Sequence, residues 1–154
     1  YRVERSVNGG SFLLWIVLPA NTVSYVDPAV SLGSSYRYRV VAANSAGNAP
    51  ASNIASVTVP GAVPAAPTSL GGVAASKTEI RLSWIDNAST ETGFAIERSS
   101  NGSTWTQIAT VGANVRSYAS GGLKSNTSYY YRVRAFNTWG NSAYTSTVSV
   151  KTLR

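Results

Sequence analysis

The feature that most constrains the fold is an internal repeat. Residues 1–60 align without a gap with residues 94–153, and 20 of the 60 pairs are identical. The longest similar stretch is YRYRVVAAN at 36–44 against YYYRVRAFN at 129–137. Self-similarity at a fixed spacing indicates that one structural module is present more than once. We therefore predict two copies of the same fold in the 154-residue chain.

The second copy has the pattern of short strands separated by turns. IRLSW at 80–84 alternates apolar and polar residues, as a half-buried strand does. FAIERS at 94–99 and WTQIATV at 105–111 flank Asn101-Gly102, which predicts a hairpin with type I′ turn geometry. No stretch has a convincing helical period. The predicted fold class is all-β, a sandwich of two sheets that bury the apolar faces of their strands against each other.

Several residues of the second copy also follow the pattern of a known family. They are Pro67, Trp84, Leu123 and the run Tyr129, Arg132, Val133 and Ala135. Residues 64–153 resemble a fibronectin type III domain, which is an immunoglobulin-like β-sandwich. The resemblance implies a core position for Trp84 and a tyrosine corner at Tyr129, with Val30 and Tyr36 as the first-copy counterparts of Leu123 and Tyr129. The sequence of residues 97–111 is similar to that of modules in bacterial secreted proteins, where such modules often lie beside polysaccharide-degrading domains. This similarity implies an extracellular or cell-surface location.

The first copy is shorter than the second. Its first residue aligns with Phe94 on the third strand, so the first two strands and the Trp84 position have no counterpart, and one sheet is left with a single strand. We predict two tandem fibronectin type III β-sandwiches, the N-terminal one incomplete. Residues 1–59 form the C-terminal part of one domain, 60–66 a linker and 67–154 a complete domain. Because half a core cannot offset the entropy of ordering the chain, we expect either that the chain continues upstream or that strands of another molecule complete the first copy.

The composition argues against an enzyme. The chain has no Cys and no His, which excludes disulfides, Cys or His metal ligands and the commonest general base. Glu4 and Glu97 are repeat equivalents that we expect to pair across strands with Arg39 and Arg132. The other acidic residues in loops are expected to cap backbone N–H groups; they are Asp27, Asp86 and Glu91. We predict no catalytic, cofactor-binding or metal site.

The charge and hydropathy patterns limit the partners. The net charge is +7, but the basic residues form no run, so we expect a solvated basic surface and not a nucleic-acid site. The longest apolar run, Phe12–Leu18, is too short to span a bilayer, so we expect no membrane insertion. The resemblance to the fibronectin type III family implies that this run is the edge strand of its sheet, a position that proteins normally protect with charge. Leu13, Leu14 and Val17 stand where the second copy has polar residues, which are Thr106, Gln107 and Thr110.

Two aromatic residues are present in the second copy and absent from the first. Trp139 and Tyr144 stand where the first copy has Ala46 and Ala51, so the fold does not require them. Together with the apolar run they form the candidate interaction surface: Phe12, Leu13, Leu14, Trp15, Val17, Trp139 and Tyr144. We expect something outside the first copy to cover Leu13, Leu14 or both.

Three functions fit this pattern. The first is a non-catalytic extracellular spacer or interaction module of a larger multidomain protein. The second is a structural subunit of a surface filament or layer, assembled through the apolar edge strand and strand complementation. The third and weaker one is a glycan-binding module that uses Trp139 and Tyr144. The expected partners are neighbouring domains of the same parent chain, other protein chains, or polysaccharide.

Overall fold

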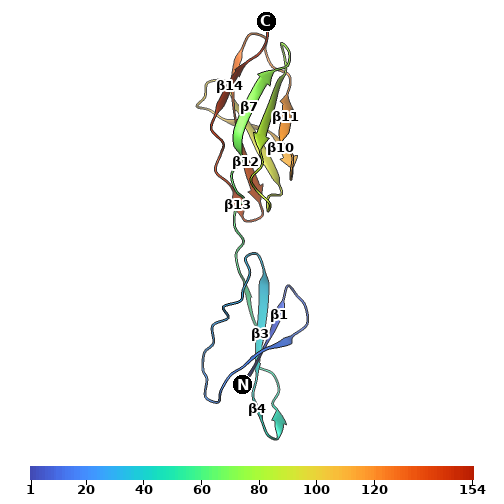
Figure 1. Ribbon diagram of the computed structural model, residues 1–154, viewed down its shortest axis with the longest axis vertical. Helices are drawn as coiled ribbons and strands as arrows, with labels where there is room; N and C mark the ends of the chain where they lie inside the picture. Colours follow the sequence, from blue (N-terminus) through green and yellow to red (C-terminus); the bar gives the residue numbers. More distant parts are fainter. The chain divides into compact units, whose positions relative to one another are not determined.

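The computed structural model describes residues 1–154 and divides them into two compact units, Tyr1–Ala62 and Val63–Arg154. Every regular element is a β-strand, which confirms the predicted all-β class (Figure 1). No helix is long and apolar enough to cross a membrane. The predicted linker, the domain boundaries and the tandem arrangement stay predictions.

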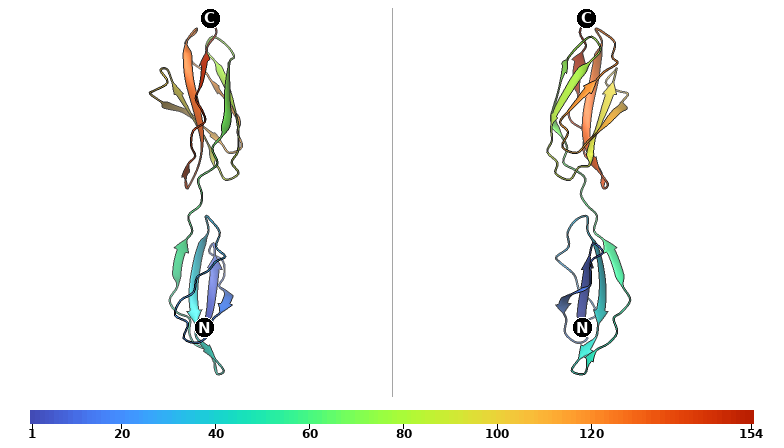
Figure 2. Two further views of the ribbon diagram at one scale, coloured as in Figure 1. Left: turned by 60° about the vertical axis from the view of Figure 1, so that its left-hand side comes forward. Right: turned by 90° about the vertical axis from the view of Figure 1, so that its right-hand side faces the viewer.

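Unit 2, residues 63–154, is a two-layer sandwich (Figure 2). One sheet has the order β10-β9-β12, with β13 and β14 also paired to β12, and the other has the order β11-β8-β7. The strands of this unit are β7 (Thr68–Ala74), β8 (Ile80–Ile85), β9 (Gly93–Ser99), β10 (Thr106–Gly112), β11 (Ser117–Ser120), β12 (Ser128–Asn137), β13 (Gly140–Asn141) and β14 (Val148–Lys151).

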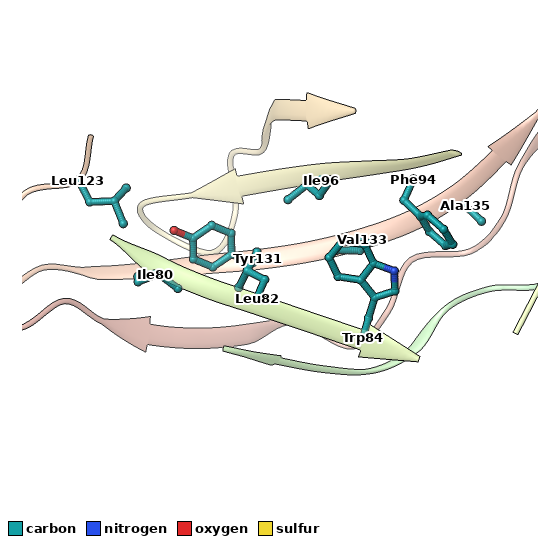
Figure 3. Close-up of a cluster of buried hydrophobic side chains, with 9 residues drawn as sticks. All are labelled: Ile80, Leu82, Trp84, Phe94, Ile96, Leu123, Tyr131, Val133 and Ala135. Atoms are coloured by element: carbon teal, nitrogen blue, oxygen red, sulfur yellow. The ribbon is translucent and has the colours of Figure 1, made fainter. Parts of the chain in front are cut away.

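The core of unit 2 lies between β8 on one side and β9 and β12 on the other (Figure 3). The predicted alternation of β8 holds, because Ile80, Leu82 and Trp84 are buried while the residues between them are exposed. Trp84 lies against Phe94 with the ring centroids 5.6 Å apart, so its predicted core position is confirmed. The nine buried residues are Ile80, Leu82, Trp84, Phe94, Ile96, Leu123, Tyr131, Val133 and Ala135.

The hairpin between β9 and β10 is confirmed, but its turn geometry is not type I′. Gly102 has a positive φ of 76°, whereas Asn101 is not among the residues with positive φ. The Asn101 side chain instead accepts hydrogen bonds from the backbone N–H groups of Ser103 and Thr104. A side-chain acceptor of this kind closes a longer loop, and no second left-handed residue is needed.

Unit 1, residues 1–62, is built around one sheet with the order β2-β1-β3-β6. Its strands are β1 (Arg2–Val7), β2 (Leu13–Val17), β3 (Ser35–Val41), β6 (Ala55–Thr58) and a separate short hairpin of β4 (Ala43–Asn44) and β5 (Gly47–Asn48). At the offset of the repeat, the four strands of the sheet correspond to β9, β10, β12 and β14 of unit 2.

The single remaining strand that we expected in the second sheet of unit 1 is absent. Residues 24–27 align with β11, yet they form no strand and run as an irregular connection (Figure 1). In unit 2, β11 is held by antiparallel pairing with β8. Unit 1 contains no equivalent of β8, so the backbone of residues 24–27 has no ladder partner and forms no strand.

Both units contain the tyrosine corner. The Tyr129 hydroxyl accepts a hydrogen bond from the backbone N–H of Lys124 at 3.0 Å. The Tyr36 hydroxyl accepts one from the N–H of Ser31 at 2.7 Å. Tyr36 and Ser31 are the repeat equivalents of Tyr129 and Lys124, so the role predicted for both tyrosines is confirmed.

Candidate functional site

The apolar run lies on the edge strand β2, as its sequence predicts. Leu13, Leu14 and Val17 are 71%, 48% and 62% exposed. In the pairing with β1, Leu13 lies opposite Arg5 and Leu14 lies opposite Glu4, which places the two leucines on different faces of the sheet. Unit 1 therefore has an unpaired strand edge with apolar side chains on both faces.

The aromatic members of the run, Phe12 and Trp15, contact arginine side chains within unit 1. The Arg39 guanidinium carbon lies 4.4 Å from the centre of the Phe12 ring, and that of Arg5 lies 3.3 Å from the centre of the Trp15 ring. Both distances are those of cation–π contacts. Of the five residues predicted from the run, Leu13, Leu14 and Val17 are exposed, while Phe12 and Trp15 contact arginine side chains of the same sheet.

The same edge in unit 2 is polar. Thr106 and Gln107 are exposed on β10, and the Gln107 side-chain amide donates to the Thr110 hydroxyl at 3.1 Å. A polar edge is the usual protection against unwanted strand pairing. The two edges of the repeat therefore differ in chemistry while they share one position in the fold.

Tyr144 is part of an arginine stack on the outer face of β12. The stack consists of Trp105, Arg132, Tyr144 and Glu97, with the Arg132 guanidinium 4.3 Å from the Trp105 ring centre and 3.9 Å from the Tyr144 ring centre. Arg132 pairs with Glu97 at 2.6 Å, and the Tyr144 hydroxyl donates a hydrogen bond to the same carboxylate. Tyr144 is therefore tied into the unit and is not a free aromatic platform.

The predicted cross-strand ion pairs are both confirmed. Glu97 lies opposite Arg132 in the β9–β12 register, and Glu4 lies opposite Arg39 in the β1–β3 register. The Arg39–Glu4 distance is also 2.6 Å. The sequence did not reveal the stacking of Arg132 between two rings, because Tyr144 and Trp105 are far apart along the chain.

The groups around Glu97 shift the pKa of its carboxyl group. Burial alone would raise the pKa of Glu97, but hydrogen bonds from Tyr144 and Arg132, together with the positive charges of Arg132 and Arg134, outweigh it and lower the pKa. The pKa of Tyr144 is raised by its own burial and by the carboxylate that it contacts. The stack is consequently held with an ionised Glu97 and a neutral Tyr144 at neutral pH.

Trp139 stands apart from this stack. It is 43% exposed in the turn between β12 and β13, and its backbone N–H donates to the Asn137 side-chain oxygen at 2.8 Å. The structure thus leaves Trp139 accessible and holds Tyr144 in place. The apolar edge belongs to unit 1, and Trp139 and Tyr144 belong to unit 2.

A groove lies on unit 1, on the side where the repeat alignment finds no counterpart of the first two strands of the second copy. It has a volume of about 680 Å³ and lies on the inner face of the β1–β3–β6 sheet. It is lined mainly by apolar residues, namely Tyr1, Val3, Leu18, Val23, Tyr25, Val30, Tyr38, Val40, Val57 and Val59, with Thr22, Ser24 and Asp27. The repeat equivalents of several of these residues form the core of unit 2.

Asp27 is the charged group of this groove. Its carboxylate accepts a hydrogen bond from the Ala29 N–H, which confirms the predicted capping role. It also pairs with Arg5 at 2.9 Å and accepts a hydrogen bond from the Tyr38 hydroxyl at 2.7 Å. Burial would raise the pKa of Asp27, but the bonds from Tyr38, Ala29 and Arg5 lower it overall. Burial and the contact with Asp27 raise the pKa of Tyr38 to about 12.

The remaining acidic residues also have structural partners. Asp86 accepts a hydrogen bond from the Ala88 N–H and Glu91 accepts one from the Asn114 N–H, as the capping prediction requires. Glu79 pairs with Arg81. No three His, Cys, Asp or Glu residues are grouped in a way that could hold a metal ion.

Comparison with known proteins identifies the fold family. The model of the fibronectin type III domain matches residues 65–151, which is more than half of the chain. The chain belongs to the fibronectin type III family. The family resemblance predicted from the sequence is confirmed for the second unit, while the incomplete first copy stays a prediction.

Relatives of this fibronectin type III chain include much longer proteins. Chitinase A1 of Niallia circulans is 34% identical over 157 residues, an alignment that covers 94% of this chain and 21% of the chitinase. Exoglucanase B of Cellulomonas fimi is 32% identical over 152 residues and is covered to 13%. Fibronectin type-III domain-containing protein 3a of Gallus gallus is 31% identical over 149 residues and is covered to 12%. The chain spans about a fifth or less of each relative.

A solved structure supports the fold. The crystal structure of the chicken CNTN1 FN1-FN3 domains is similar to this chain with a TM-score of 0.62, over 99% of this chain and 55% of that one. The sequence identity is 23%, so this similarity concerns the fold alone.

Proposed function

We propose that this chain is a non-catalytic spacer and interaction module of a larger, extracellular multidomain protein. The observation that carries the proposal is its small share, 12% to 21%, of three much longer relatives. Fibronectin type III domains are generally non-catalytic modules and occur within enzymes as accessory domains. The carboxylates of this chain are engaged in ion pairs and backbone caps, which suits a structural role.

The proposed location and partners follow from the same relatives. Two of them are named as a chitinase and an exoglucanase, which act on polysaccharides. We therefore place this chain outside the cell or at its surface, next to other domains of its own parent protein. Its role there is to set the distance between neighbouring domains.

The direct test is the behaviour of residues 62–154 as a separate protein. We expect a monomer with a single cooperative unfolding transition, since the unit has a closed two-layer core of nine buried apolar residues. We also expect neither hydrolysis nor retention on chitin or β-glucan. Persistent aggregation or an unfolded NMR spectrum would contradict the claim that these residues fold as an independent module. Hydrolysis of either polysaccharide would contradict the non-catalytic role.

The glycan-binding alternative depends on Trp139. If unit 2 is retained on an insoluble polysaccharide and Trp139→Ala abolishes this retention, the chain is a glycan-binding module and the spacer hypothesis is wrong. Tyr144→Phe is the matched control, because it keeps the second ring and changes only the hydroxyl bound to Glu97.

The second candidate function is assembly through the apolar edge, and the exposure of Leu13, Leu14 and Val17 favours it. The second copy supplies a matched control: the triple change Leu13→Thr, Leu14→Gln and Val17→Thr installs the residues that β10 carries at the same positions. If the edge mediates assembly, sedimentation of the full chain will show self-association that this variant loses. A monomeric full chain, or equal association of the variant, would remove this candidate.

A further inference from the structure

The repeat places an Asn-Gly pair in the same hairpin of each unit. Asn8-Gly9 lies between β1 and β2, and Asn101-Gly102 lies between β9 and β10. Both asparagines are exposed to solvent. An asparagine before a glycine is chemically labile, because no glycine side chain hinders the attack of the glycine nitrogen on the asparagine side-chain carbonyl carbon. In a folded chain the reaction requires that this nitrogen and the asparagine side chain are free to move.

In unit 2 the glycine nitrogen is held by a buried serine. The Gly102 N–H donates a hydrogen bond to the Ser99 hydroxyl oxygen at 2.9 Å, and the Asn101 N–H donates to the same oxygen at 3.2 Å. The Asn101 side-chain oxygen accepts hydrogen bonds from the Ser99 hydroxyl and from the N–H groups of Ser103 and Thr104. Because Ser99 is only 3% exposed, water competes poorly for these bonds. The pair is therefore locked in place.

In unit 1 the equivalent serine is bound elsewhere. The Ser6 hydroxyl donates a hydrogen bond to the Gly10 carbonyl oxygen and accepts one from the Arg37 guanidinium at 3.1 Å. Arg37 stands where unit 2 has Tyr130. Since Ser6 is turned toward Arg37 and Gly10, the Gly9 N–H is left without an acceptor in the chain.

The Asn8 side chain is also less restrained than that of Asn101. Its oxygen accepts one hydrogen bond, from the Ser35 N–H at 2.9 Å. A Cβ atom at Gly9 would meet no atom within 4 Å, whereas one at Gly102 would lie 3.7 Å from the Tyr130 ring. Unit 1 thus exposes to water the glycine that an aromatic ring flanks in unit 2.

We propose that Asn8 is a site of spontaneous covalent modification, at which it converts to aspartate and isoaspartate through a cyclic imide with Gly9, and that the Ser99 hydroxyl protects Asn101 from the same reaction. The Gly9 nitrogen loses its proton and bonds to the Cγ of Asn8, while the Cγ–Nδ2 bond breaks and ammonia leaves with that proton. Water then opens the imide. Cleavage of the bond between nitrogen and Cγ gives aspartate, and cleavage at the backbone carbonyl gives isoaspartate. Nothing is oxidised or reduced, and water is the co-reactant.

The modification changes the turn that leads into the edge strand β2. Either product adds a carboxylate next to Gly9, whose carbonyl oxygen accepts a hydrogen bond from Arg37 at 3.3 Å. Isoaspartate also inserts a methylene group into the backbone, and we expect this to loosen the pairing of β2 with β1. The inference concerns the hairpins of the two units and does not rest on the spacer role of the chain.

The test compares the two asparagines within one chain. The full chain is incubated in mildly alkaline buffer, and tryptic peptides 6–37 and 99–116 are followed by mass spectrometry that locates the converted residue. We expect Asn8 to convert at least about ten-fold faster than Asn101, since Gly102 must first break its hydrogen bond. In urea, where neither hairpin is folded, the two rates should agree within about two-fold.

Three results would overturn the proposal. They are equal rates in the folded chain, faster conversion of Asn101, and a difference that is equally large in urea, because the last would assign the effect to the neighbouring sequence and not to the fold.

Two variants test the residues that cause the difference. Ser99→Ala removes the acceptor of the Gly102 N–H, so the rate at Asn101 should rise roughly ten-fold while the rate at Asn8 stays unchanged. Arg37→Tyr installs the residue of unit 2 and releases Ser6, so conversion of Asn8 should slow. Slowing cannot arise from misfolding, because loss of structure would speed the reaction. An unchanged rate at Asn101 in the first variant would refute the protecting role of Ser99, and an unchanged or higher rate at Asn8 in the second would refute the role of Arg37.

Discussion

The arrangement of Tyr144 leads to a quantitative prediction about unit 2. Tyr144→Phe removes the hydroxyl that donates to the Glu97 carboxylate, a bond to a charged acceptor of the kind that contributes about 1.5–3 kcal/mol. Glu97 keeps its bonds from Arg132, so we expect the lower end of this range, about 1.5–2 kcal/mol. Tyr144→Ala also removes the ring that lies 3.9 Å from the Arg132 guanidinium, a contact that contributes about 0.5–1 kcal/mol, and exposes apolar area beneath the ring. We expect a total loss of about 2–4 kcal/mol.

The assay is urea unfolding of residues 62–154 followed by tryptophan fluorescence, with free energies from linear extrapolation. Trp139→Ala is the control: it truncates an exposed aromatic side chain in the neighbouring turn, and we expect a change below about 0.5 kcal/mol. If Tyr144→Ala were as mild as this control, the arginine stack would not stabilise the unit. A Tyr144→Phe variant as stable as the parent would show that the bond to Glu97 contributes nothing.

Three further predictions concern close packing and titration. Gly93→Ala should destabilise unit 2 by at least about 2 kcal/mol, because the added Cβ would lie 2.3 Å from the Val111 carbonyl oxygen, whereas Gly112→Ala, with no atom within 4 Å, should be nearly neutral in the same urea assay. The lowered pKa of Glu97 means that this residue stabilises unit 2 above the ordinary glutamate pKa and loses this contribution as the pH falls through the lower pKa of the folded state. We therefore expect the free energy of unfolding of unit 2 to decrease between about pH 5 and pH 3, and to decrease less steeply in Glu97→Gln. The raised pKa of Tyr38, about 12, means that its contribution is present below the ordinary tyrosine pKa and is lost as the pH rises through about 12; ultraviolet titration should find it among the last tyrosines to ionise, and Asp27→Asn should lower its pKa.

Much of the local structure could be predicted because each residue of the repeat can be compared with its equivalent in the other copy. Glu4 and Glu97 face arginines at equivalent positions of two sheets, and Tyr36 and Tyr129 close equivalent corners. The alternation of β8 was visible in its first five residues, because a strand buried on one face has a period of two. These features depend on neighbours in the ladder, which periodicity reveals.

The features that were missed depend on contacts across the fold. The ring of Tyr144 meets Arg132 only because the chain returns to the outer face of β12 after β13, and no spacing rule encodes that return. Alternation along β3 shows which side chains point inward, but not whether a second layer covers them. The repeat alignment left the inner face of the first copy without a partner, so the exposure of Val40 was expected, whereas the absence of a strand at residues 24–27 emerged only from the structure.

Hydrogen exchange of the full chain tests the central claim most directly, namely that unit 2 is a self-sufficient module and unit 1 is open on one face. β9 and β12 lie in a two-layer core, and their equivalents β1 and β3 lie in a sheet with a solvent-facing groove. We expect the inner amides of β9 and β12 to exchange only through global unfolding of unit 2, and those of β1 and β3 to exchange at least 100-fold faster. Equal protection of the two sets of strands would contradict this account.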